Sequence, residues 1–153
     1  MRTEIIYCSH SGNTKRVAEA IADVIGARGP ADVVPVETAA TTIADTVDLL
    51  IIGSPTEGHG IPQEMRRFLE RLDPASVQGR SAAAFDTRVR WPRILSGSAS
   101  AGIAKRLTAK GARVTGPQGS FIVTTEPALE EGELERARAW AAALADAVLP
   151  VTV

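Results

Sequence analysis

Residues 4–14 read Glu4-Ile5-Ile6-Tyr7-Cys8-Ser9-His10-Ser11-Gly12-Asn13-Thr14. A short apolar run over residues 5–8 gives way at once to six polar residues, and apolar residues at Val17, Ile21 and Ile25 follow. This succession is typical of a buried strand, a tight loop and a helix. The loop 9–14 therefore lies where the unpaired N–H groups of a new helix point outward. Such a place favours anions, and phosphate is the anion that we expect.

Three common phosphate-binding patterns do not fit this loop. The Walker A pattern needs a lysine directly after its last glycine, whereas an asparagine follows Gly12. The dinucleotide fingerprint needs three spaced glycines, and the loop holds one. A cysteine phosphatase needs an arginine six residues after its cysteine, but the residue at that distance from Cys8 is Thr14. The remaining pattern is a hydroxyl-rich loop of the form [ST]-x-[ST]-G-x-T.

This pattern resembles the phosphate loop of the flavodoxin family, which holds the phosphate of flavin mononucleotide (FMN). The resemblance implies that FMN is the cofactor and that backbone N–H groups and hydroxyls solvate its phosphate. It assigns phosphate binding to Ser9, His10, Ser11, Gly12, Asn13 and Thr14. A histidine at position 10 could donate to the phosphate or titrate near neutral pH.

The rest of the chain alternates between strand and helix patterns. Strands are expected at 3–8, 31–36, 47–53 and 81–85, with a fifth at 112–115 that resumes at 121–123. Helices are expected at 13–27, from Pro62, from Ser98 and at 131–148, with only a short helical turn within 38–47. Near-continuous apolar strands separated by helices predict one α/β domain over residues 1–153, a three-layer doubly wound fold with a five-stranded parallel sheet. The resemblance implies the strand order 2-1-3-4-5, and Pro35 places the second strand near an edge.

Three loops follow strand ends and should border one crevice, at 9–14, 53–61 and 86–97. By resemblance, the isoalloxazine ring lies between the loops 53–60 and 86–92, and the Glu57-Gly58 peptide presents its carbonyl to the flavin. The expected contacts are Ser54, Pro55, Thr56, Glu57, Gly58, His59, Asp86, Thr87, Arg88 and Trp91. Trp91 is the first candidate for an aromatic wall against the ring. Arg88 and Arg90 would make this side of the site cationic.

Composition narrows the function classes. The 153 residues carry a formal net charge of −1, which does not suggest binding to nucleic acid or to an anionic membrane. One cysteine excludes a disulfide within the chain, and no secretion leader or apolar span is visible, so we expect a cytoplasmic protein. No cysteine and histidine spacing typical of a metal site is present, so no metal is expected.

The leading hypothesis is an FMN-binding electron-transfer protein that exchanges electrons with redox partner proteins. The cofactor would carry the chemistry, and no side chain need be catalytic. One alternative is an FMN-dependent NAD(P)H oxidoreductase that acts on quinones or similar acceptors. A second alternative is a flavin-free interaction or signalling domain on the same fold.

Overall fold

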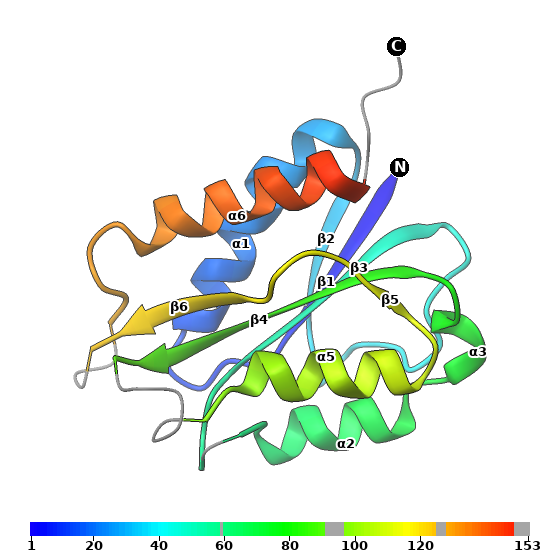
Figure 1. Cartoon of the computed structure of the whole chain (residues 1–153), viewed down its shortest axis with the longest axis horizontal. Helices are drawn as coiled ribbons and strands as arrows, with labels where there is room; N and C mark the ends of the chain where they lie inside the picture. Colours follow the sequence, from blue (N-terminus) through cyan, green and yellow to red (C-terminus); the bar gives the residue numbers. More distant parts are fainter. Residues whose placement is uncertain (59, 91–96, 125–127, 149–153) are drawn as a thin grey trace.

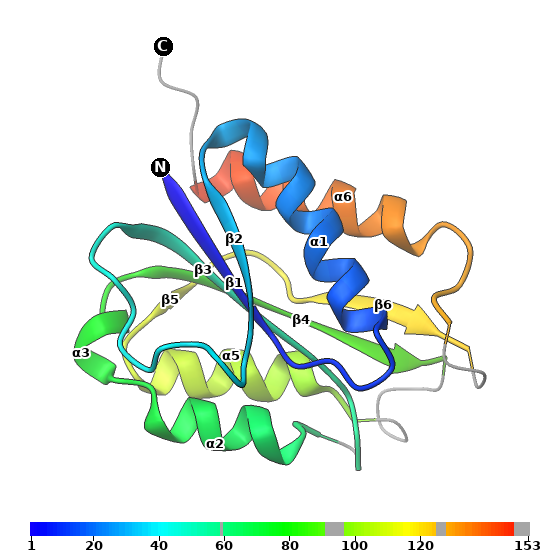
Figure 2. The same cartoon turned by 180° about the vertical axis from the view of Figure 1, so that it is seen from behind.

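The computed structural model describes residues 1–58, 60–90, 97–124 and 128–148. Its elements form three layers, with α1 (Asn13–Ile25) and α6 (Glu133–Val148) on one face of a central sheet. Helices α2 (Gln63–Arg71) and α5 (Ala99–Ala109) cover the other face, as Figures 1 and 2 show from opposite sides. The predicted three-layer α/β class is confirmed.

The sheet contains β1 (Arg2–Tyr7), β2 (Ala31–Pro35), β3 (Val47–Pro55), β4 (Ser81–Val89), β5 (Arg113–Val114) and β6 (Gly119–Val123). Its order is β2-β1-β3-β4-β5, with parallel pairing throughout, which confirms the predicted order and the edge position of Pro35. Two segments share the fifth position, because β5 pairs with the start of β4 and β6 with its end. The break between them turns at Gly116, whose φ is +72°.

The helices begin and end close to their predicted positions. Ser98 caps α5, where its Oγ accepts from the N–H of Ala101 at 3.2 Å, and Gly111 follows α5 with φ +94°. Short helical segments also occur at η1 (Gly26–Arg28) and α3 (Pro74–Val77). The expected helical turn within 38–47 is wrong, because residues 36–46 form only turns, bends and irregular backbone. No helix of the described residues is long and apolar enough to cross a membrane.

The core has two layers because successive strand residues point to opposite faces. On the α1 and α6 face, the rings of Phe85, Phe121 and Trp140 lie with their centroids 6.2–6.4 Å apart. The Phe85 ring lies directly over Gly53, where an added Cβ would be 2.1 Å from Cζ. Tyr7 is buried, and Trp140 packs against the core, as expected. A rigid aromatic layer thus supports the carboxyl ends of β3 and β4.

Candidate functional site

Strand β4 is longer than the sequence indicates. We expected it to end at Phe85, but it continues to Val89, because β3 pairs with it on one side and β6 on the other. Asp86, Thr87 and Arg88 are therefore strand residues and not loop residues, which corrects their predicted placement. Strand β3 likewise continues to Pro55 and includes Ser54.

The loop 9–14 joins β1 to α1 as expected. Gly12 occupies the N-cap of α1 with φ +91°, and a Cβ added there would meet nothing within 4 Å. The Oγ of Ser9 accepts from the N–H groups of Gly12 (3.1 Å) and Lys15 (3.3 Å), so that this hydroxyl shapes the loop. Gly12 therefore leaves open space beside it at the positive end of the α1 dipole.

Three backbone donors of this loop are available to a ligand. Within the described part of the chain, the N–H groups of Ser11, Asn13 and Thr14 make no hydrogen bond. The side chain of Asn13 is buried and donates to Ser11 Oγ at 3.2 Å. A free helix N-terminus with hydroxyls beside it provides what a phosphate dianion needs.

Hydrogen bonds join the loop 9–14 to the ends of β3 and β4. Thr14 is 2% exposed, and its hydroxyl is hydrogen-bonded to the hydroxyl of Thr87 on β4 at 2.9 Å. The N–H of Thr56 donates to the carbonyl of Thr87 at 2.8 Å. The structure thus brings together the three segments that the sequence predicts to border one crevice.

A tight turn follows β3. The backbones of Glu57 and Gly60 exchange two hydrogen bonds, each of 2.9 Å, and Gly58 adopts φ +53°. In this arrangement, the Glu57 carbonyl already has a partner in the Gly60 N–H. The Oγ1 of Thr56 accepts from the N–H of Ala99 at 3.0 Å, which fixes the turn to the start of α5.

Two residues that we expected to contact the flavin have buried side chains, and these side chains are hydrogen-bonded to other groups of the protein. Asp86 is fully buried, and its Oδ2 accepts from the N–H of Ser100 at 2.9 Å and from Ser98 Oγ at 3.3 Å. Its Oδ1 accepts from Ser120 Oγ at 2.6 Å. Ser54 is also fully buried and donates to the carbonyl of Pro55. The side-chain oxygens of Asp86, an expected flavin contact, thus face α5 and β6.

The arginines form a weaker cationic surface than expected. Arg90 pairs with Glu130, with a shortest N–O distance of 2.8 Å. The half-buried Arg88 donates through Nε to Ser120 Oγ at 2.7 Å. The expected contacts at His59 and Trp91 lie outside the described residues.

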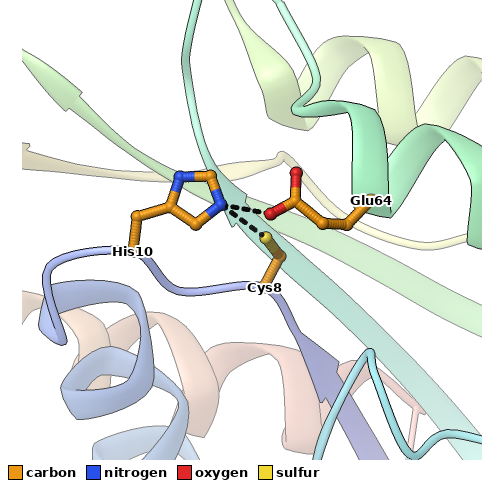
Figure 3. Close-up of side chains that lie close together, drawn as sticks. All are labelled: Cys8, His10 and Glu64. Atoms are coloured by element: carbon orange, nitrogen blue, oxygen red, sulfur yellow. Dashed lines mark hydrogen bonds and ion pairs between the residues drawn. The ribbon is translucent and has the colours of Figure 1, made fainter.

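His10 extends across the site and away from the loop backbone. Its Nδ1 is hydrogen-bonded to Oε1 of Glu57, and its Nε2 lies 2.5 Å from Oε2 of Glu64, in the first turn of α2. The same Nε2 lies 3.5 Å from the thiol of Cys8. Figure 3 shows the side chains of Cys8, His10 and Glu64 pointing toward one another. The bond to Glu64, followed by that to Glu57, raises the pKa of His10 above its ordinary value and favours the imidazolium.

The thiol of Cys8 is in an unusual environment. Cys8 is fully buried, as expected for a core residue. Burial, together with the carboxylates of Glu64, Glu37 and Glu57, raises the pKa of Cys8 to about 12. Sequence reasoning missed the approach of Glu64, which lies 54 residues from His10 in the chain. The alternation of polar and apolar residues in α2 gives no sign of it.

Comparison with known proteins decides the family. The sequence matches the flavodoxin family over residues 5–140. The chain belongs to the flavodoxin family. A search of curated proteins found no match.

Solved flavodoxins share the fold of this chain. Oxidised Flavodoxin 1 from Bacillus cereus superposes with a TM-score of 0.82 at 24% identity, covering 99% of this chain and 100% of that one. A flavodoxin from the domain Archaea gives a TM-score of 0.81 at 24% identity, with 95% and 97% covered. The rubredoxin:oxygen oxidoreductase of Desulfovibrio gigas gives a TM-score of 0.75 at 21% identity. The match covers 94% of this chain and 35% of that longer chain.

Proposed function

We propose that this flavodoxin binds FMN at the carboxyl edge of its sheet and carries electrons between redox partner proteins. The loop 9–14 supplies the main support. It offers three free N–H donors around the open N-cap at Gly12, and Thr14 links it to β4. These groups fit a phosphate dianion without a cationic clamp, because charge-assisted bonds from several donors replace its hydration.

The isoalloxazine ring would lie between the loops 53–60 and 86–92. Since the side chains of Ser54 and Asp86 are buried and bonded, their part in binding is to hold the backbone in place. Gly58 gives the turn its positive φ, and the Glu57 carbonyl would have to release the Gly60 N–H before it could face the ring. Arg88 and Trp91 complete the proposed set of contacts.

Bound FMN would supply the redox chemistry. The protein's part is to position the cofactor, exclude water on one side and set the local charge. A cytoplasmic location belongs to this proposal, because the single cysteine is a free thiol.

A pair of glycine variants tests the site. Gly12 and Gly116 both have positive φ and open space where a Cβ would go, so alanine strains both backbones alike. Gly12→Ala should release FMN during desalting, because it disturbs the proposed phosphate loop, whereas Gly116→Ala should retain it. The measurement is flavin absorbance of the desalted proteins, and equal retention by both variants would contradict the proposed site.

An assay with NAD(P)H distinguishes an electron-transfer protein from an NAD(P)H oxidoreductase. We expect the pure FMN-loaded chain to show no sustained NAD(P)H oxidation with a quinone acceptor. Steady turnover in that mixture would instead identify an oxidoreductase.

A further inference from the structure

Cys8, His10 and Glu64 form a mixed donor cluster at the border of the proposed flavin site. Cys8 directly follows β1, His10 lies in the loop 9–14, and Glu64 lies in the first turn of α2. The Sγ, imidazole nitrogen and carboxylate oxygen all lie within 4.8 Å of one another. Figure 3 shows the three side chains meeting. A thiol, an imidazole and a carboxylate together are the ligand types that zinc takes in proteins.

The distances suit a shared ion. Zinc bonds sulfur at about 2.3 Å and nitrogen or oxygen at about 2.0–2.2 Å, so two ligands at a tetrahedral angle lie roughly 3.5 Å apart. Cys8 Sγ and His10 Nε2 are already 3.5 Å apart. Nε2 and the Glu64 oxygen are 2.5 Å apart and would have to separate. The Glu64 side chain is 42% exposed, so it is free to make that adjustment.

The surroundings of the cluster also favour a cation. Glu57 is hydrogen-bonded to Nδ1 of His10, the nitrogen that does not face the cluster. A carboxylate on the outer nitrogen is the usual partner of a metal-binding histidine, because it fixes the ring and strengthens the ligand. The carboxylates of Glu57 and Glu64 thus lie on the two nitrogens of the His10 ring, next to the thiol of Cys8.

We propose that Cys8, His10 and Glu64 bind one divalent ion of the zinc type, with Glu57 orienting the histidine and water completing a tetrahedral shell. On binding, the proton of Cys8 Sγ and the proton of His10 Nε2 leave to solvent. Glu64 binds as the carboxylate, and the Nδ1–H of His10 keeps its bond to Glu57. No electron transfer accompanies binding.

Calorimetric titration of the untagged full chain with Zn²⁺ tests the proposal. We expect one ion per chain, with protons released to the buffer, which titration in two buffers of different ionisation enthalpy measures. Glu57→Gln should weaken binding about 10- to 100-fold, the usual effect of losing an orienting partner. Cys8→Ala and Glu64→Gln remove ligands and should weaken binding more.

Glu70→Gln is the matched control, because it removes one negative charge from α2 without removing a ligand. It should bind zinc like the wild type. Circular dichroism of each variant shows whether it is folded, and X-ray absorption of the zinc-loaded wild type should show one sulfur at about 2.3 Å. Equal affinity of the wild type and Cys8→Ala, or a zinc shell without sulfur, would overturn the proposal and leave an adventitious surface ion.

Discussion

Replacement of Asp86 tests whether its carboxylate stabilises the fold or contacts the flavin. Its buried carboxylate accepts from Ser98, Ser100 and Ser120, and so joins β4 to α5 and β6. Asp86→Asn has nearly the same shape but replaces one of the two acceptor oxygens with an NH₂ group. If the remaining oxygen keeps the bond to Ser120, the new donor faces the N–H of Ser100.

The expected loss follows from that conflict. A buried donor left without an acceptor costs about 1–3 kcal/mol. We therefore expect Asp86→Asn to lower the free energy of unfolding by about 2 kcal/mol. For a domain of this size, each kcal/mol typically lowers the midpoint of thermal unfolding by about 2–4 °C. The midpoint of thermal unfolding should thus fall by about 4–8 °C. The variant should remain folded at 25 °C and bind FMN within about threefold of the wild type, since typical stabilities of 5–15 kcal/mol leave a margin.

Urea unfolding of the flavin-free chain and fluorescence titration with FMN measure the two effects separately. Asp73→Asn is the control, because Asp73 also caps a helix through its side chain but lies at the start of α3. It should cost no more than about 1 kcal/mol. Unchanged stability of Asp86→Asn with FMN affinity lowered tenfold or more would refute this reasoning and return Asp86 to the flavin contacts.

Two further predictions concern residues near the site that stabilise the fold. Gly53→Ala places a Cβ 2.1 Å from the buried ring of Phe85. Urea unfolding should therefore show a free energy of unfolding lower by at least about 1–3 kcal/mol. Gly60→Ala has open space at its Cβ and should leave the free energy of unfolding nearly unchanged. Glu133 accepts from Arg136, which lowers the pKa of Glu133 below its ordinary 4.5. Its charge therefore stabilises the fold above pH 4.5, and that contribution is lost as the pH falls through the folded pKa. Glu133→Gln should accordingly be less stable than the wild type by about 1–2 kcal/mol at neutral pH, and the difference should shrink in acid; a constant difference across that range would contradict the assignment.

The parallel sheet could be predicted because apolar runs alternate with helix patterns along the chain, and its strand order could be predicted from the resemblance to the flavodoxin family. The end of β4 could not, because residues 86–88 are polar and read as a loop. The burial of Asp86 depends on Ser98, Ser100 and Ser120, and that of Thr87 on its bond to Thr14, all far from β4 in the sequence. A polar residue whose partners are distant in sequence leaves no local signal of being buried.

The position of the loop 9–14 between β1 and α1 could be predicted from the sequence, but the environment of His10 could not. The loop's shape depends on local contacts, such as those of Ser9 Oγ with two nearby N–H groups. The His10 side chain instead meets Glu64, which in the sequence reads as an ordinary acidic residue in the first turn of a helix. The two come together because α2 packs into the same core cluster as Cys8.

The most direct test of the central claim is a comparison of FMN with riboflavin, which lacks the phosphate. Fluorescence titration of the full chain with each ligand gives two dissociation constants. If the loop 9–14 holds the phosphate, two charge-assisted bonds of about 1.5 kcal/mol or more each should favour FMN at least 100-fold. Equal affinity for the two ligands, or no binding of either, would contradict the account.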